Sequence, residues 1–314
     1  MFSDPLGPYG PLLWPPLLLA FAAVARLLLP QRLHLQWLVG TWAQALRHKT
    51  LHSNRPAGQQ RLAGLLALLL VLLPLLVMAS LALLHPALEL LLLTLLLPLA
   101  QLPGKALAEA LQRADKTAAL KLLSPFAMRD LTPLSLMGLT KAAIELQLER
   151  RSSQFFAVSF WYLLGGMPLA MLAWSAAELA RHWHIEKPPM AAFGAPTWQL
   201  SSLLQWPVQL LLGFTLSLYG SPAQAWQWRH QLSQHWQWRY QQWSQLCLAS
   251  SLGIQLSGPW LLEGHKALRP RLGPEIAPQP AQLVRAVNML NLAQGLWLLI
   301  PMLLAVTISW LSHQ

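Results

Sequence analysis

The strongest constraint on the fold is the apolar run LAGLLALLLVLLPLLVMASLALL at residues 62–84, which carries no charged residue. The hydrocarbon core of a bilayer is about 30 Å thick, and about 20 apolar residues in a helix cross it. The whole chain is 55% hydrophobic and only 11% charged, whereas a soluble domain carries about 25% charged residues. The sequence therefore predicts an integral membrane protein.

Six apolar stretches are long enough to be considered as membrane spans. The candidate spans are residues 12–29, 62–84, 87–103, 155–178, 203–219 and 290–311. The start of the chain has no basic region of the kind that precedes a cleaved signal sequence, so we expect the first span to remain as an anchor. No alternating strand pattern is visible. We predict an all-α, polytopic fold with about six transmembrane helices, forming a single membrane domain over residues 1–314.

The basic residues predict an orientation for these spans. Segments 31–61, 104–154 and 220–289 carry five, eight and six Lys or Arg residues, whereas segment 179–202 carries two. The positive-inside rule places the first three segments in the cytoplasm as helical loops. Both termini then lie outside, in a multi-pass protein of the bacterial cytoplasmic (inner) membrane. The net charge of +11 is explained by this bias and by attraction to anionic lipid headgroups, and it does not indicate nucleic-acid binding.

Several local patterns lie inside or beside these loops. Helical spacing from residue 104 is stopped by Pro125, and Thr132-Pro133 resembles a helix start that leads through Glu149 towards the fourth span. Gly165-Gly166 inside that span favours close helix contact. The tetrapeptide WQWR occurs at 226–229 and 236–239. It suits either a helix at headgroup level or stacking on a flat ligand or a nucleobase.

Common catalytic motifs are missing from the sequence: it has no phosphate-binding loop, dinucleotide fingerprint, HExxH or GxSxG. The single cysteine, Cys247, and the scattered histidines form no metal-ligand pattern, so we predict no metal-ligating residues. His182 and His184 fall on the predicted outer side without a carboxylate partner.

Two charged cytoplasmic segments remain as candidates for a site, MRDLTPLSLMGLTKAAIELQLERR at 128–151 and LGIQLSGPWLLEGHKALRPRLG at 252–273. Asp130, Glu145 and Glu149 could bind magnesium or act as a general base. The alternative is a solvated helix face in the first segment, and plain positive-inside bias in the second.

Seven short stretches of the chain also occur in a recognisable order. They read RDLTPLS, KAAIELQLER, AVSFWYLLGG, FGAPTWQLSSLLQWPVQLL, LSGPWLLEG, LRPRLG and QLVRAVNML. In this order they resemble the adenosylcobinamide-phosphate synthase family, the CobD or CbiB membrane proteins of cobalamin biosynthesis, from about residue 32 onward. The resemblance implies an ATP-dependent acid–amine ligase that amidates adenosylcobyric acid with aminopropanol or its phosphate.

The resemblance further implies ATP and Mg²⁺ as cofactors, a corrinoid substrate, and the bilayer and other cobalamin-pathway proteins as partners. It carries over roles to seven residues. These are Arg129, Asp130 and Glu145 as catalytic residues, and Lys141, Glu149, Arg269 and Arg271 as cofactor-binding residues. The chain departs from the family pattern at Leu131, Arg150 and Gln154, where the family has polar or acidic groups.

Three classes of function follow. A ligase predicts that Arg129, Asp130 and Glu145 converge with Arg269 and Arg271 on one cytoplasmic cleft. A non-catalytic regulatory or sensory protein of the inner membrane, like the related AmpE group, predicts that these charges are dispersed in water. A transporter is disfavoured because ionisable residues are sparse in the spans.

Overall fold

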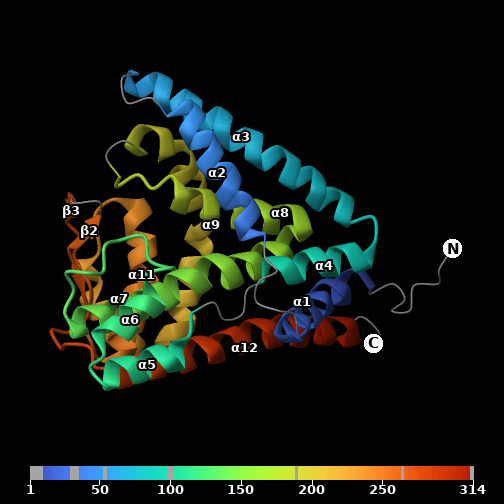
Figure 1. Ribbon diagram of the computed structural model, residues 1–314. Coiled ribbons are helices and arrows are strands. Elements are labelled where there is room, and N and C mark those ends of the chain that lie inside the picture. Colours follow the sequence, from blue (N-terminus) through green and yellow to red (C-terminus); the bar gives the residue numbers. More distant parts are fainter. Residues whose placement is uncertain are drawn as a thin grey trace.

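The computed structural model (Figure 1) describes residues 10–28, 35–51, 55–97, 102–187, 190–262 and 265–311, and these are mostly helical. The α-helices are α1 (Gly10–Leu28), α2 (Gln36–Thr50), α3 (Ala57–Ala82), α4 (Pro86–Leu96), α5 (Gly104–Gln112), α6 (Lys116–Leu123), α7 (Leu136–Arg151), α8 (Ala157–His182), α9 (Ala191–Ser217), α10 (Pro222–Gln227), α11 (Trp236–Leu252) and α12 (Pro280–Leu311). A π-helical turn, η2 (Ser152–Phe156), joins α7 to α8, and a 3₁₀ turn, η4 (Trp228–Gln231), follows α10.

Four short strands lie between α11 and α12. They are β1 (Leu256–Ser257), β2 (Trp260–Leu262), β3 (His265–Ala267) and β4 (Arg271–Leu272). β1 pairs antiparallel with β4, and β2 pairs antiparallel with β3. The sequence prediction did not include them, because strands of two or three residues are too short to show an alternating pattern.

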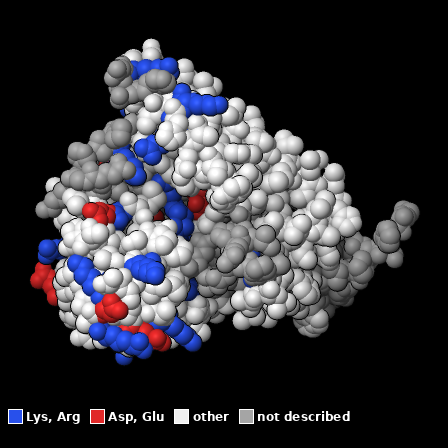
Figure 2. Space-filling view, viewed as in Figure 1, with Lys and Arg blue, Asp and Glu red and all other residues white. Residues whose placement is uncertain are grey.

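Charged and apolar surfaces separate along the molecule. Figure 2 shows the Lys, Arg, Asp and Glu side chains gathered over α5, α6, α7 and the strands, with a second, basic group at the top where α2 and α3 meet, and a nearly uncharged half on the right. On α3, Leu66, Leu70 and Leu73 are each about 60% exposed. Exposed leucines in a continuous row favour contact with lipid over contact with water.

The described helices do not confirm six spans. By length and composition alone, three helical segments could cross a membrane, namely Ala57–Ala82, Leu136–His182 and Pro280–Leu311, but the second of these is interrupted at Gly165 and Gly166. The apolar part of α1, Leu13–Leu28, and α4, Pro86–Leu96, are shorter. Residues 98–101 of the predicted third span lie outside the described residues. The predicted fifth span, 203–219, forms the second half of α9, much of which packs against α11 rather than facing lipid.

The predicted fourth span does not run straight through the membrane. The side-chain amide of Gln154 donates a hydrogen bond to Oε1 of Glu178, at 2.9 Å. In a straight helix, 24 residues span about 36 Å, so the chain must fold back between these residues. It does so at Gly165 and Gly166, whose backbone is non-helical. The prediction of a single crossing was wrong, because the glycines form a turn rather than a helix contact.

The fold-back changes the side on which the following loop lies. The hairpin tip at Gly166 lies near Leu83, at the end of α3. Both hairpin ends therefore return to the charged end of the molecule, where Glu186 meets Arg269. The expected separation of segment 179–202 from the predicted cytoplasmic loops is therefore wrong for His184 and Glu186, which contact Trp260 and Arg269 of segment 220–289.

Two helix boundaries in segment 104–154 also differ from prediction. The helix predicted from residue 104 is broken by Ala114, with φ of 57°, and restarts where the Asp115 side chain accepts from the Ala118 N–H. α7 begins at Leu136 rather than at Pro133, because Ser135 caps it by accepting from the Gly138 N–H. α7 then continues through η2 into α8, as predicted.

Candidate functional site

A hollow at the charged end is formed where three distant segments of the chain meet. It consists of two adjoining cavities, of about 90 and 30 Å³. Both are lined by Glu149 of α7, His184 after α8, Gln245 of α11, Trp260 of β2 and Arg269 before β4. Because these residues are far apart in sequence, the hollow exists only in the folded chain.

A buried ion pair closes one wall of the smaller cavity. Arg129 Nη2 lies 2.7 Å from Glu145 Oε2, and the two side chains are 15% and 11% exposed. The other carboxylate oxygen of Glu145 accepts the backbone N–H of Ser257 at 2.6 Å. Glu145 therefore has both oxygens engaged and ties α7 to the loop before it and to β1. These contacts make it a structural anchor for the wall.

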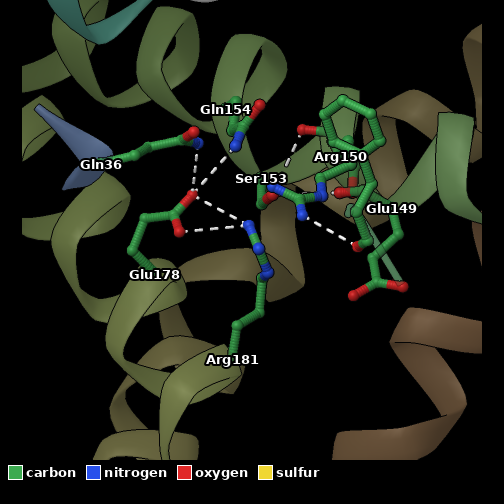
Figure 3. Close-up of polar contacts among 9 residues, drawn as sticks. Gln36, Glu149, Arg150, Ser153, Gln154, Glu178 and Arg181 are labelled. Carbon is green, nitrogen blue, oxygen red and sulfur yellow. Dashed lines mark hydrogen bonds and ion pairs between the residues drawn. The ribbon is translucent and has the colours of Figure 1, made fainter. Parts of the chain in front are cut away.

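Glu149 lies one helical turn beyond Glu145 and faces both cavities. Within the described residues its carboxylate makes no hydrogen bond or ion pair. Figure 3 shows this carboxylate pointing away from the neighbouring polar network. Its negative charge nevertheless favours the protonated forms of His184 and Arg269 and so acts to raise the pKa of each. Glu149 is therefore the acidic group placed to meet a ligand.

Trp260 is the centre of a stack of cationic and aromatic groups. The Arg269 guanidinium lies 3.4 Å from the centroid of its ring and that of Arg129 lies 5.3 Å away. Glu186 accepts from the Trp260 indole N–H at 2.8 Å and forms an ion pair with Arg269 at 3.1 Å. Burial lowers the pKa of Arg269, and Glu186 opposes that shift. The stack fixes the planes of Trp260 and Arg269 at the cavity wall.

His184 stands against the same stack, with its ring 6.0 Å from that of Trp260. Burial lowers the pKa of the imidazole, while Glu186 raises it and Arg269 lowers it further. A pKa below the usual value of about 6.5 leaves the ring neutral at pH 7. Its Nδ1 accepts the backbone N–H of Glu186 at 3.2 Å, so Nε2 of the neutral ring carries the hydrogen and is a hydrogen-bond donor.

A polar network centred on Glu178 supports the wall of the larger cavity that Arg181 lines (Figure 3). Glu178 Oε1 accepts from the side-chain amides of Gln36 and Gln154, and Arg181 Nη1 reaches both of its oxygens at 3.0 and 3.1 Å. Arg181 also lines the larger cavity. The network thus joins α2, η2 and α8 at the base of the hairpin and holds a guanidinium at the edge of the cavity.

Aromatic side chains form the remaining wall of the larger cavity. Trp198 and Trp206 of α9 pair with Trp238 and Tyr240 of α11, with ring centroids 5.3 and 5.2 Å apart. The two WQWR repeats therefore differ. Trp238 of the second repeat lines the cavity, whereas its counterpart in the first, Trp228, is half-buried against the core and does not line it, and Trp226 is 58% exposed. Stacking on a flat ligand is possible at the second repeat, and an interfacial position remains the interpretation of the first.

Comparisons with known proteins identify the family. A family model described as CobD/Cbib protein matches residues 17–290. The chain belongs to the CobD/CbiB family. A relative described as cobalamin biosynthesis protein CobD from Stutzerimonas stutzeri is 31% identical over 279 residues, covering 86% of this chain and 91% of the relative. A protein of the same description from Chromobacterium violaceum is 29% identical, covering 81% and 83%. No solved structure matches the chain.

The predicted site residues of this CobD/CbiB chain fall into three groups. Arg129, Glu145 and Arg269 line the hollow, together with Glu149. The ligase hypothesis also expected Asp130 and Arg271 in the same cleft, and these two do not line it. Lys141 and Arg271 lie behind this wall on either side of Gly258: a methyl group there would be 3.5 Å from Lys141 Nζ and from Arg271 Cγ. They add positive charge near the hollow without lining it.

Asp130 is placed differently from the other predicted residues. Its carboxylate is exposed and accepts from the backbone N–H and the hydroxyl of Thr132 at 3.0 and 2.7 Å. These bonds lower the pKa of Asp130. The side chain shapes its own turn and does not line the hollow. Its catalytic role stays a prediction that the geometry does not support.

The sequence interpretation missed His184, Glu186 and Trp260. The first two were assigned to the outer side because the fourth span was taken as a straight crossing. Trp260 lies in a β-hairpin too short to recognise from sequence. The Gly165-Gly166 pair was the available signal, since two adjacent glycines in an apolar run also permit a turn.

The hollow fits the family's implied cofactors in part. Within the described residues no three His, Cys, Asp or Glu side chains cluster as a metal-binding group. Mg²⁺ needs no such cluster, since it is commonly held by one or two carboxylates together with substrate phosphates. Glu149 supplies one unpaired carboxylate. Arg181 and Arg269 supply cations at the cavity wall for phosphate oxygens.

Proposed function

We propose that this chain acts in cobalamin biosynthesis as a membrane-bound acid–amine ligase. The reaction joins the amino group of aminopropanol, or of its phosphate, to a propionate carboxyl of adenosylcobyric acid. A C–N bond forms, a carboxyl C–O bond breaks, and the amine gives up protons. The product is adenosylcobinamide or its phosphate.

The observation that carries this proposal is that three kinds of group converge on one hollow. They are a carboxylate without a partner among the described residues, a neutral imidazole and two guanidinium groups. These are Glu149, His184, and Arg181 with Arg269. Membership of the CobD/CbiB family and the descriptions of the relatives supply the pathway. A non-catalytic surface has no need to gather these groups against aromatic walls.

The size of the hollow supports a large substrate that presents only a side group. Its larger cavity of about 90 Å³ is well below the roughly 300–1,000 Å³ of sites that enclose a whole small molecule. A propionate arm and a short amine can enter it while the corrin ring remains outside. Trp206, Trp238 and Tyr240 then offer faces for the ring at the rim.

The side chains of the hollow take separate parts in the reaction. Arg181 and Arg269 orient carboxylate and phosphate oxygens by charge-assisted hydrogen bonds. His184, neutral at pH 7 with Nδ1 bound to the Glu186 N–H, donates a hydrogen bond from Nε2 to a substrate oxygen, and the proton of the attacking amine leaves with the displaced phosphate. The stack on Trp260 keeps water from the reacting carbon and holds Arg269 in one plane. Glu149 and the two arginines would hold ATP with Mg²⁺, which would supply the activation that lets the carboxyl oxygen leave as part of a phosphate.

We place the hollow on the cytoplasmic side of the bacterial inner membrane. The charged end of the molecule (Figure 2) holds the loops in which most basic residues occur, as the positive-inside rule requires of cytoplasmic segments. ATP and the polar substrates would reach it there directly.

The test is complementation combined with product analysis. The gene is expressed in a bacterium that lacks its own synthase, and conversion of cobyric acid to cobinamide phosphate is measured by mass spectrometry. We expect conversion by the wild type, and a loss of at least a hundredfold for Glu149→Gln. Glu109→Gln, which removes an exposed carboxylate of α5, serves as the matched control and should retain activity.

The same experiment separates the ligase from the regulatory alternative. No conversion by a wild-type protein that is correctly inserted and stably folded would refute the ligase proposal and favour an AmpE-like role. Conversion that is unaffected by Glu149→Gln would keep the activity but remove Glu149 from the mechanism.

A further inference from the structure

A second pair of cavities lies on the far side of α11 from most of the hollow. They have volumes of about 420 and 320 Å³ and share Phe214, Trp226 and Trp243 as lining residues. We call this surface the aromatic groove. It is bounded by α9, α10, η4 and α11, and Tyr240 is the one of its lining residues that also lines the hollow.

The floor and one rim of the aromatic groove are apolar and open. Phe214 is 57% exposed and Trp226 is 58% exposed, although water-facing proteins usually cover such side chains. Leu211 and Leu218 continue the exposed apolar surface along α9. The floor is therefore continuous with a surface that suits lipid.

The other rim is cationic and faces no acidic residue. Arg229, His230 and Arg239 line the larger cavity, and no Asp or Glu is among its lining residues. The sequence from 188 to 262 contains no acid at all. Arg229 donates to the backbone carbonyl of Trp226 and stacks on the face of its ring, and Arg239 donates to the carbonyl of Ser233. Among the residues that the structure describes, the two guanidinium groups make no other hydrogen bond or ion pair. Their remaining donors are available to an anion.

The aromatic groove adjoins a helix that can cross the membrane. The indole N–H of Trp297, in α12, donates to the hydroxyl of Thr215, at 3.1 Å. Thr215 is next to Phe214 on α9, and α12 belongs to the helices long and apolar enough to span a bilayer. Indole rings are enriched at the boundary between hydrocarbon and headgroups. Phe214 therefore lies close to bilayer depth, with the arginines on the headgroup side.

We propose that the aromatic groove binds an anionic phospholipid of the surrounding bilayer. Arg229 and Arg239 hold the phosphate, and one acyl chain lies along Phe214, Trp226 and Trp243. A neutral lipid lacks the net charge that the rim selects, and a soluble phosphate lacks the chain that fills the floor. The proposal is independent of the ligase reaction, because none of the five residues named here lines the hollow.

Native mass spectrometry of the full-length protein tests the proposal. The protein is released from nanodiscs that contain phosphatidylglycerol and phosphatidylcholine, and the retained lipid is counted. We expect preferential retention of phosphatidylglycerol. The double variant Arg229→Gln/Arg239→Gln should weaken that binding by a factor on the order of ten or more, since each basic residue near the surface contributes substantially to anionic-lipid binding. Arg113→Gln/Arg285→Gln, two exposed arginines outside the groove, is the charge-matched control.

A second pair of variants tests the apolar floor. Trp226→Ala should lower phosphatidylglycerol retention severalfold, whereas Trp37→Ala, which removes a tryptophan of α2 that is 75% exposed, should not.

Four results would overturn the proposal. The first is an equal loss of phosphatidylglycerol retention in both arginine double variants, and the second is unchanged retention in Arg229→Gln/Arg239→Gln. The third is displacement of the lipid by inorganic phosphate at matching concentrations. The fourth is a dimer that dissociates when Trp226 is replaced by alanine. The first indicates general charge attraction, the third an anion site only, and the last a second copy of this chain in the groove.

Discussion

The turn that folds α8 back on itself depends on one backbone conformation. Gly166 has φ of 67° and ψ of −162°, a region that is essentially reserved for glycine because a Cβ atom clashes with the backbone there. A methyl group at this position would otherwise have room, since its nearest neighbours, in Leu83 and Pro168, lie 3.9 Å away. Gly166→Ala therefore isolates the backbone cost of the turn.

The expected size of that cost is about 1–3 kcal/mol of unfolding free energy, the usual penalty for holding a residue other than glycine in such a region. Gly165→Ala should lower the free energy of unfolding by more than a change in backbone preference alone would. A Cβ atom there would lie 2.1 Å from Cδ1 of Leu169, so that side chain has to move. Gly295→Ala is the control, because Gly295 lies within the helix α12 and a methyl group on it meets nothing within 4 Å.

Thermal unfolding in a mild detergent measures these differences. We expect Gly166→Ala to lower the melting temperature by a few degrees, and Gly295→Ala to leave it unchanged or to raise it slightly. Because the hairpin carries Glu178 and Arg181 to the hollow, ligase activity should fall with stability. A Gly166→Ala protein that melts and works like the wild type would refute the fold-back.

Three further predictions concern the hollow. Glu145→Gln should destabilise the protein by about 1–3 kcal/mol, because Arg129 loses a mostly buried ion-pair partner. A double-mutant cycle with Arg129→Gln should show a coupling energy between the two residues. Additive effects of the two substitutions on stability would refute the pairing. The lowered pKa of His184 means that the unfolded chain binds a proton before the folded protein does as pH falls below about 6.5. Stability should therefore fall on acidification through that value, and His184→Gln should flatten this profile in melting experiments from pH 7.5 to 5. Asp130→Asn should leave activity in the complementation assay unchanged, because an amide oxygen can still accept from Thr132; a large loss would return Asp130 to the mechanism.

Hydropathy predicted the helices that run through apolar surroundings along most of their length. α3 and α12 are long and apolar, and their positions follow from the sequence with small errors at the ends. The fourth span could not be predicted in the same way, because average hydropathy is the same for a straight helix and for a hairpin of equal composition. The difference resides in the dihedral angles of Gly165 and Gly166, which no composition window detects.

The sequence predicts which site residues lie together best where they belong to the same helix. Glu145 and Glu149 lie four apart in one helix, so their common face followed from periodicity alone. The resemblance to known proteins added Arg129 and Arg269, which the fold brings to the same hollow. His184, the remaining group of the hollow with clear chemistry, reaches it only because the chain turns back, so it could not be assigned before the turn was known.

The hairpin also has a consequence for how the protein enters the membrane. Both of its ends lie at the charged end of the molecule, which we propose to be cytoplasmic. With that orientation Arg181 and Lys187 do not have to cross the bilayer during biosynthesis, and moving a basic residue through hydrocarbon is costly. Insertion of this segment then requires only that an apolar loop enters the bilayer from the cytoplasmic side.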